Sequence, residues 1–306
     1  MEAERLKREI RRLARERHAV ILVHNYQMPE IHDVADLAGD SLDLSLKAAA
    51  TDARVVVFCG VNFMAETAAV LCSDKQVILA HEAAGCPMAD SITAERLLAR
   101  KEELGGPPVV AYVNTTAEVK AESDVCCTSA NVVRVINSLE GFFRVLAVPD
   151  RNLAEYARRH TEKEVLLWPG VCPIHDGLTA DDVEEVKARH PGALFVAHPE
   201  CRPEVLDLAD AIRSTTGMLV FCRKSPARMF IIGTEEGLLY PLRRKNPGKI
   251  FVSASPRLVC PDMKRTRLTD VIAALEGARA QVRVPEATAS RARLAIERML
   301  ALPRDY

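Results

Sequence analysis

Short runs of consecutive apolar residues alternate along the chain with longer amphipathic segments. Val55-Val56-Val57-Phe58 is one such run, and a run of this kind is typical of a parallel strand buried on both faces. The alternation predicts right-handed β–α–β crossovers in an α/β protein with parallel sheets. Strands are expected at residues 18–24, 54–59, 76–81, 108–113, 124–128, 143–148, 164–168, 193–197, 211–214, 229–232 and 249–253. Helices are expected at about 30–51, 63–73, 115–122, 130–140, 151–160, 203–209, 217–225 and 236–245, with a charged helix-like segment at 1–17 and a helical tail at 268–302.

Four polar landmarks follow these runs in the same order three times, about 84 to 90 residues apart. In each repeat, the first apolar run ends in a polar triplet, and a serine follows. The third apolar run then ends in a short polar motif, and a Cys-Pro pair comes last. The landmarks are His24-Asn25-Tyr26, Tyr112-Val113-Asn114 and His198-Pro199-Glu200; Ser41, Ser129 and Ser214; Cys59-Gly60, Pro149-Asp150 and Gly233-Thr234-Glu235; and Cys86-Pro87, Cys172-Pro173 and Cys260-Pro261. Registered landmarks of this kind indicate an old triplication.

The repeat predicts three pseudo-threefold-related αβα units with parallel sheets around a central active site. We expect the first unit at 1–100 with the C-terminal helices of 268–306, the second at 101–187 and the third at 188–267. Each unit is small for an independent core, so the units should pack tightly together, with the tail on the first unit. Because the landmarks fall at the carboxyl ends of strands, where open α/β sheets bind ligands, they should face one cavity.

Composition excludes several classes of partner. The chain has 306 residues, of which 48% are hydrophobic. Its net charge is −1, so it lacks the excess of basic residues that binding to nucleic acid or to an anionic membrane requires. No apolar run approaches the ~20 residues of a membrane span. Nine cysteines without paired spacing, and no export signal at the N-terminus, favour a reducing cytoplasm.

The three Cys-Pro cysteines, Cys86, Cys172 and Cys260, suggest a shared metal centre rather than a disulfide framework, which uses cysteines in pairs. Structural zinc usually takes four ligands, often from tight Cys-x-x-Cys motifs, and none occurs here. A [4Fe–4S] cluster held by three cysteines keeps one iron open as a Lewis acid, which suits a dehydrating enzyme. No Cys-x-x-x-Cys-x-x-Cys motif supports radical chemistry with S-adenosylmethionine. The remaining cysteines, expected to be buried apolar residues, are Cys59, Cys72, Cys126, Cys127, Cys201 and Cys222.

Eight motifs, in order from about residue 20 to residue 276, resemble the quinolinate synthase family, the A protein of NAD biosynthesis. The motifs are Val23-His24-Asn25-Tyr26-Gln27, Gly39-Asp40-Ser41-Leu42, the segment 58–67, Tyr112-Val113-Asn114-Thr115, the segment 126–131, the segment 168–173, the segment 198–204 and Ser214-Thr215-Thr216-Gly217-Met218. The resemblance implies three αβα units around a [4Fe–4S] cluster. It also implies a condensation of iminoaspartate with dihydroxyacetone phosphate that gives quinolinate, phosphate and water.

The resemblance carries roles to individual residues. Its cluster ligands match Cys86, Cys172 and Cys260. Its substrate-binding positions match His24, Ser41, Tyr112, Asn114, Ser129, His198, Glu200 and Thr215, and Tyr26 and Ser214 lie in the same motifs. Two departures are visible: Pro87 follows the first ligand in place of a serine-like residue, and no cysteine follows Cys260, so the redox-switch disulfide of some members cannot form.

The same residues make chemical sense without the resemblance. Hydroxyl and amide donors near helix N-termini suit substrates that carry carboxylates and a phosphate. Tyr26, His198 and Glu200 are the expected proton-transfer groups. His32, His160 and His190 are expected to be structural, and no role is assigned to Asp33, Glu66, His175 and Lys224.

Two other functions stay open at this point. One is a different open-iron hydro-lyase that acts on a small dicarboxylate, and the other is a non-enzymatic iron–sulfur sensor. If the chain is a quinolinate synthase, transient contact with L-aspartate oxidase or aspartate dehydrogenase is expected, because iminoaspartate is unstable.

Overall fold

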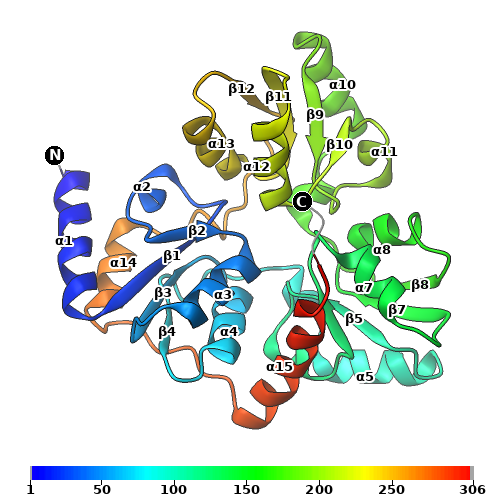
Figure 1. Ribbon diagram of the computed structural model, residues 1–306, viewed down its shortest axis with the longest axis horizontal. Coiled ribbons are helices and arrows are strands. Elements are labelled where there is room, and N and C mark those ends of the chain that lie inside the picture. Colours follow the sequence, from blue (N-terminus) through cyan, green and yellow to red (C-terminus); the bar gives the residue numbers. More distant parts are fainter. Residues whose placement is uncertain (1, 304–306) are drawn as a thin grey trace.

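Three four-stranded parallel sheets form the framework of the described chain, residues 2–303 of the computed structural model (Figure 1). The ends of the predicted ranges 1–100 and 268–306 lie outside these residues. The first sheet contains β1 (Ala19–His24), β2 (Leu37–Gly39), β3 (Val55–Cys59) and β4 (Gln76–Leu79). The second contains β5 (Val109–Tyr112), β6 (Val125–Cys127), β7 (Arg144–Val148) and β8 (Glu164–Leu167), and the third contains β9 (Leu194–Ala197), β10 (Ala211–Ile212), β11 (Met229–Gly233) and β12 (Ile250–Ser253).

Strand order is the same in all three sheets. The orders are β2-β1-β3-β4, β6-β5-β7-β8 and β10-β9-β11-β12, and every pairing is parallel. Each sheet lies in its own lobe, and the lobes surround a common centre (Figure 1). The predicted α/β class with three repeated units is therefore confirmed. We propose the unit boundaries 1–100, 101–187 and 188–267.

Helices connect and cover the strands. They are α1 (Glu2–Glu16), α2 (Pro29–His32), α3 (Ser41–Ala50), α4 (Asn62–Leu71), α5 (Ala94–Glu103), α6 (Ala117–Ala121), α7 (Val132–Ser138), α8 (Arg151–Arg158), α9 (Pro173–Asp176), α10 (Ala180–Arg189), α11 (Pro203–Leu206), α12 (Thr215–Lys224), α13 (Leu239–Lys245), α14 (Leu268–Leu275) and α15 (Glu286–Leu300). Two 3₁₀ turns lie at Ala89–Ser91 and Glu236–Leu238. No helix in residues 2–303 has the length and apolar character needed to cross a membrane.

One hydrogen bond marks the repeat in every unit. The aspartate before the second strand accepts a hydrogen bond from an amide of the first strand, 15 residues upstream. The pairs are Asp36 with Ile21 at 2.8 Å, Asp124 with Val109 at 2.7 Å and Asp210 with Phe195 at 2.7 Å. The carboxylate accepts a hydrogen bond from a first-strand amide that would otherwise lack a partner, and it holds the start of the second strand beside the first. The same contact therefore supports the pairing of these two strands in each sheet.

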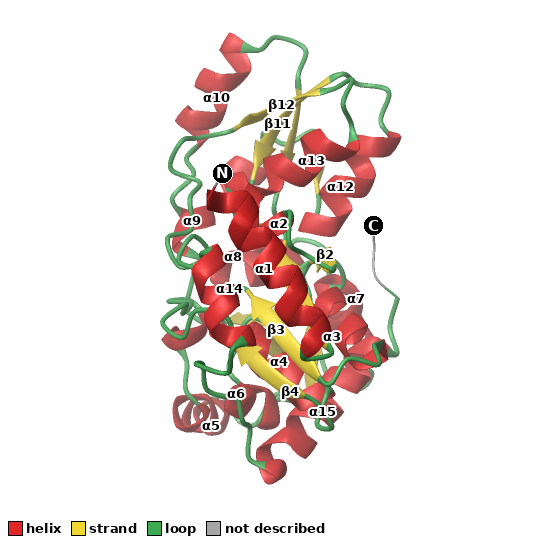
Figure 2. Cartoon of the chain, turned by 90° about the vertical axis from the view of Figure 1, so that its left-hand side faces the viewer, coloured by secondary structure: helices red, strands yellow, loops and turns green. Residues whose placement is uncertain are grey.

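The C-terminal tail joins two units. α14 packs on α1 over the outer face of the first sheet, as Figure 2 shows. α15 packs chiefly along α6 and β6 of the second unit and also contacts α4 of the first. The expectation that the whole tail packs on the first unit is therefore right for α14 and wrong for most contacts of α15.

The predicted helix at 30–51 is wrong, because it contains the short strand β2 between α2 and α3. Three residues are too few to show a strand pattern, and pairing with β1 stabilises them as a strand. Three helices, α5, α9 and α10, were not expected. Helix α9 has only four residues, and α5 and α10 are mostly polar and bury one and two residues, so their apolar signal is weak although Thr93 and Thr179 cap their N-termini.

Candidate active site

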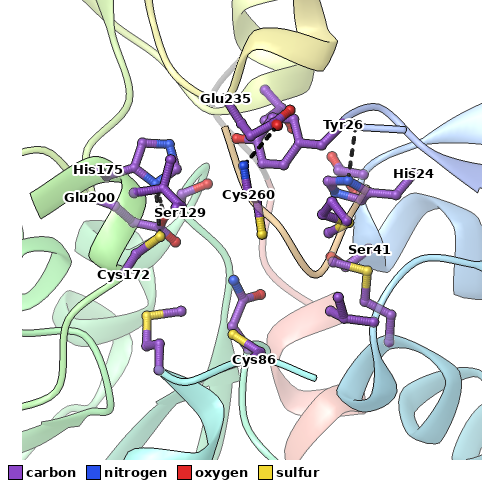
Figure 3. A pocket seen from close by; sticks show the side chains of 18 of the residues that line it. His24, Tyr26, Ser41, Cys86, Ser129, Cys172, His175, Glu200, Glu235 and Cys260 are labelled. Carbon is purple, nitrogen blue, oxygen red and sulfur yellow. Dashed lines mark hydrogen bonds and ion pairs between the residues drawn. The ribbon is translucent and has the colours of Figure 1, made fainter. Parts of the chain in front are cut away.

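The carboxyl ends of the three sheets open onto one cavity of about 290 Å³. All thirteen residues singled out in the sequence line this cavity, and they approach it from all three units (Figure 3). They are His24, Tyr26, Ser41, Cys86, Tyr112, Asn114, Ser129, Cys172, His198, Glu200, Ser214, Thr215 and Cys260. The structure therefore brings every predicted site residue together, as parallel sheets with converging carboxyl ends require.

Two strand-end histidines have the same local geometry in the first and third units. His24 Nδ1 accepts a hydrogen bond from the amide of Tyr26 at 3.2 Å, and His198 Nδ1 accepts one from the amide of Glu200 at 3.3 Å. Burial lowers the pKa of each imidazole to about 3, so both rings are neutral at ordinary pH. Because Nδ1 accepts, the single ring proton of each histidine is on Nε2, which makes that atom a hydrogen-bond donor.

A chain of hydrogen bonds links the three units along the cavity wall. The Tyr26 hydroxyl lies 2.6 Å from Thr234 Oγ1, which lies 2.8 Å from His175 Nε2. His175 Nδ1 lies 2.7 Å from Glu200 Oε2 and 3.2 Å from Cys172 Sγ. The His175 ring also stacks on His198, with centroids 4.7 Å apart.

Glu200 is an ionised carboxylate in a buried position. Burial alone raises its pKa, but His175 and His198, with a hydrogen bond from Tyr112, outweigh burial and lower the pKa to about 2. Its Oε1 atom is buried and has no hydrogen-bond partner among the described residues. A free carboxylate oxygen on a cavity wall is suited to accept a proton or a hydrogen bond from a ligand.

Helix N-termini bring hydroxyl groups to the cavity. Asp40 caps α3, which begins at Ser41, and Asp40 also accepts a hydrogen bond from Thr216 at 2.7 Å. Ser214 caps α12 by accepting from the amide of Gly217 at 3.2 Å, and Thr215 is the first residue of that helix. The N-termini of α3 and α12 are thus tied together at the cavity. Their dipoles and hydroxyl groups favour anions there.

The three Cys-Pro loops enter the cavity from different units (Figure 3). A buried acid after the third strand holds two of them: Asp150 accepts from the amide of Cys172 at 3.1 Å, and Glu235 accepts from the amide of Cys260 at 3.0 Å. Burial raises the pKa of all three thiols, to about 12 for Cys86. The protein alone therefore favours neutral thiols in this cavity.

The other six cysteines are buried free thiols that do not line the cavity, in agreement with their expected role. They are Cys59, Cys72, Cys126, Cys127, Cys201 and Cys222.

Sequence analysis assigned no role to His175, Thr234 and Glu235, although Thr234 and Glu235 belong to the landmark after the third strand of their unit. A local signal for His175 exists, because Pro173 starts the short helix α9 and places Cys172 and His175 three residues apart across its first turn. Thr234 is fully buried, and its partners lie 59 and 208 residues away along the chain, so local spacing does not reveal these contacts.

Comparison with known proteins gives one consistent result. Residues 8–301 match the family described as Quinolinate synthetase A protein. The chain is 53% identical over 305 residues to a quinolinate synthase of Geobacter metallireducens, covering 100% of both chains. It is 54% identical to quinolinate synthases of Desulforudis audaxviator, over 98% of this chain and 99% of that one, and of Methanoregula boonei, over 97% and 98%. A match that covers the whole site and nearly the whole sequence decides membership: the chain belongs to the quinolinate synthase A protein family.

Proposed function

We propose that this protein condenses iminoaspartate with dihydroxyacetone phosphate to give quinolinate, phosphate and water in de novo NAD biosynthesis. The observation that carries the proposal is the cavity itself. Thirteen residues predicted from the sequence line it, and the chain matches quinolinate synthases over its full length. A volume of about 290 Å³ is small for a ligand site and suits substrates of this size.

We further propose that Cys86, Cys172 and Cys260 hold a [4Fe–4S] cluster. The donor set fits: three thiols from three loops line one cavity, and their raised pKa values mean that a cation is needed to keep them deprotonated. With three protein ligands, one iron stays open and supplies a Lewis acid for a substrate oxygen. Asp150 and Glu235 would fix the backbone of two ligands by accepting their amide protons.

Substrate anions would meet hydrogen-bond donors rather than cations. The neutral His24 and His198 each offer an Nε2–H, and Ser41 and Thr215 lie at helix N-termini. Asn114, Tyr112, Ser129 and Ser214 add amide and hydroxyl groups to the same cavity. Neutral donors bind carboxylates and phosphate without trapping the product as tightly as buried cations would.

Proton transfer is assigned to Tyr26, His198 and Glu200. The condensation must lose water and move protons between carbon, nitrogen and oxygen, which requires groups that exchange protons beside the substrate. Glu200 is ionised and has a free buried oxygen, so it is the base. Burial raises the pKa of the Tyr26 phenol well above its ordinary value, so this group starts as an acid.

Metal analysis of anaerobically purified protein, together with a product assay, tests both parts of the proposal. We expect iron and sulfide in a ratio near that of a [4Fe–4S] cluster, and quinolinate as the product. Cys86→Ala, Cys172→Ala and Cys260→Ala should each lose the cluster and the activity, whereas the matched buried controls Cys72→Ala and Cys222→Ala should keep both.

Zinc without iron or sulfide would contradict the cluster. Cys172 Sγ, His175 Nδ1 and Glu200 Oε2 lie within 4.8 Å of one another, so a single divalent ion held by these three is the specific rival. A cluster-loaded protein that dehydrates other dicarboxylates but forms no quinolinate would instead favour the hydro-lyase alternative. A cluster without any turnover would favour a sensor.

We also propose a cytoplasmic location, since all nine cysteines are free thiols, as expected in a reducing compartment. Transient contact with L-aspartate oxidase or aspartate dehydrogenase would shorten the path of unstable iminoaspartate. Quinolinate formation from aspartate in a coupled assay, with and without an added scavenger of iminoaspartate, tests that contact.

A further inference from the structure

A second cavity, of about 390 Å³, lies between the second and third units, and we call it the side cavity. Ser129, Ala130 and Ser214 line both this cavity and the central one, so the two cavities share a wall. Its other lining residues come from the second unit around α7 and α8 and from the third unit around the ends of β9 and β10. None of the described residues that line it is acidic.

Arg213 is the only arginine or lysine among the described residues that line either cavity. Its guanidinium lies 5.5 Å from the centroid of the Phe221 ring, and its Nη1 donates a hydrogen bond to the Ile212 carbonyl at 2.7 Å. No described acid forms an ion pair with it, and no described residue accepts a hydrogen bond from its Nε or Nη2. Because a guanidinium has several N–H donors in a planar fork, most of them remain available to a ligand.

The third unit alone has a cation at this place in the repeat. Arg213 lies three residues after Asp210, the repeated aspartate before the second strand, and Gly39 and Cys127 hold the same place in the other two units. The first turn of α12 leaves room for its side chain, because a Cβ at Gly217 would lie 3.3 Å from Arg213 Cβ and 3.5 Å from Arg213 Cδ. The Arg213 stem therefore packs against the start of this helix and directs the charge to the side cavity.

Asn131 lines the same cavity from the second unit with an unused donor. Its side chain is buried, and its Oδ1 accepts hydrogen bonds from the amide of Thr128 at 2.8 Å and from the Thr128 hydroxyl at 3.0 Å. The amide can only donate, so it fixes which end of the Asn131 side chain is the oxygen. The Nδ2 atom at the other end is buried and has no hydrogen-bond partner among the described residues. A buried donor of this kind is costly unless a ligand or a water molecule accepts from it.

We propose that the side cavity binds a phosphate group, with Arg213 and Asn131 as donors and the hydroxyls of Ser129 and Ser214 on the shared wall. The inference rests on the proposed function, whose reaction releases the phosphate that one substrate brings. A guanidinium matches a phosphate group with two parallel charge-assisted hydrogen bonds. Among the described residues, the central cavity has no arginine or lysine in its lining, so a phosphate group at the shared wall gains a full counter-charge only from the side cavity. The same donors suit the ester phosphate of dihydroxyacetone phosphate and free inorganic phosphate.

Isothermal titration calorimetry with inorganic phosphate tests the site in anaerobic, cluster-loaded protein. Each titration is carried out in saturating quinolinate, which fills the central cavity, so that phosphate binding outside it is measured. Arg213→Met keeps an unbranched side chain and removes the charge, and Asn131→Asp replaces the free donor by an acceptor. Arg223→Met is the matched control, because Arg223 is an exposed cation in the last turn of α12 and lines neither cavity. Arg213 is only half-buried, so its truncation should leave the fold intact, which the midpoint of thermal unfolding checks.

We expect Arg213→Met and Asn131→Asp each to raise the dissociation constant of phosphate at least about 10-fold, since each removes a donor to a charged ligand. Arg223→Met should stay within about 2-fold of the wild type. The inference is overturned if the wild type binds no phosphate at about 10 mM with quinolinate bound, if Arg213→Met binds phosphate as tightly as the wild type, or if Arg223→Met weakens binding equally.

Steady-state kinetics then identify the source of the phosphate group. If the site holds the ester phosphate, Arg213→Met should raise the KM for dihydroxyacetone phosphate at least about 10-fold. If it holds the released ion, this KM should change less than about 2-fold, and the constant for product inhibition by phosphate should rise instead. Wild-type values of both constants in Arg213→Met overturn the inference. A protein that binds phosphate through Arg213 but forms no quinolinate would instead overturn the proposed function, so the two failures are distinguishable.

Discussion

Replacing Glu235 by Gln should destabilise the protein far more than replacing Asp150 by Asn, although the two acids occupy equivalent positions. Both follow the third strand of their unit, both are buried, and each accepts hydrogen bonds from the amide of a Cys-Pro cysteine and from a second nearby amide. They differ in their electrostatic partners. Burial raises the pKa of both carboxyls, but the Lys264 ammonium, 2.8 Å from Glu235, opposes this effect there, whereas the neighbouring Glu200 raises the pKa of Asp150 further.

The expected magnitude follows from that difference. Glu235→Gln leaves the Lys264 ammonium, whose side chain is 16% exposed, without its counter-charge, although the Tyr26 carbonyl still accepts a hydrogen bond from it. Removing one member of a buried ion pair costs about 3 kcal/mol at the lower end of the usual range. Asp150→Asn keeps one acceptor oxygen and leaves one of the two amides facing the new NH₂ group, as Glu235→Gln also does, but it strands no cation and should cost about 1 kcal/mol.

Thermal unfolding makes the two costs measurable. With an unfolding entropy of about 2.1 cal/mol/K per residue, a protein of this length shifts its Tm by about 5 °C for 3 kcal/mol and by about 2 °C for 1 kcal/mol. Differential scanning calorimetry of anaerobic, cluster-loaded protein should therefore separate Glu235→Gln from Asp150→Asn. The double variant Glu235→Gln with Lys264→Met, which removes both charges, should regain at least about 1 kcal/mol relative to Glu235→Gln alone. Equal shifts for the two single variants, or no recovery in the double variant, would refute the role given to Lys264.

Two further predictions concern a buried lysine and the chemistry of the cavity. Burial lowers the pKa of Lys120 from 10.5 to about 8, so between these values the unfolded chain binds more protons than the folded one, and stability should rise with pH. Relative to Lys120→Met, the wild type should gain about 2 kcal/mol in urea-unfolding free energy between pH 7 and pH 9.5, and parallel pH dependences would contradict the shift. Tyr26→Phe and Glu200→Gln should keep the cluster and quinolinate binding but turn over at least ~100-fold more slowly, whereas Ser41→Ala and Asn114→Ala should chiefly weaken binding. Near-normal turnover of both Tyr26→Phe and Glu200→Gln, at matched cluster content, would show that the proton-transfer assignment is wrong.

Buried strands were the most predictable part of the fold, because a strand covered on both faces must be a continuous apolar run. β3 is the clearest case, with all five residues buried. The elements that escaped prediction contribute little burial of their own. β2 has three residues and depends on β1 for its hydrogen bonds, and α5 buries only Leu97. Their structure is decided by neighbours that are distant in the sequence.

The cavity lining was predictable for a different reason. The landmarks recur in each unit at strand ends, and equivalent strand ends must converge when three like sheets surround one centre. The hydrogen-bond partners of the supporting residues follow no such pattern. Thr234 touches Tyr26 and His175 only because three units meet there, and a contact across 208 residues leaves no trace in local spacing. Sequence patterns thus located the groups that line the cavity and missed the hydrogen bonds that connect them.

Equivalent positions in the three units carry different residues, so the three sides of the cavity differ. Where the second and third units place Asp150 and Glu235, the first has the buried apolar residue Val61, because Cys59, Val148 and Gly233 hold equivalent places in the strand pairing. A valine side chain cannot accept a hydrogen bond, so the first unit has no acid there to hold its own cysteine loop. That loop is instead contacted from the third unit, where Asp262 accepts a long hydrogen bond of 3.4 Å from the amide of Gly85.

The same divergence separates roles among the strand-end triplets. The first and third units each supply a neutral histidine, His24 or His198, whereas the second supplies Tyr112 at the equivalent position. Two positions further on, the side chains are a phenol, an amide and a carboxylate in Tyr26, Asn114 and Glu200. Three identical units would present the same groups from three sides and could not tell one end of a substrate from the other. The only ionised carboxylate of the three belongs to one unit, and Thr234 and His175 connect it to the phenol of another unit. The three sides of the cavity therefore differ chemically, although the scaffold that carries them is threefold.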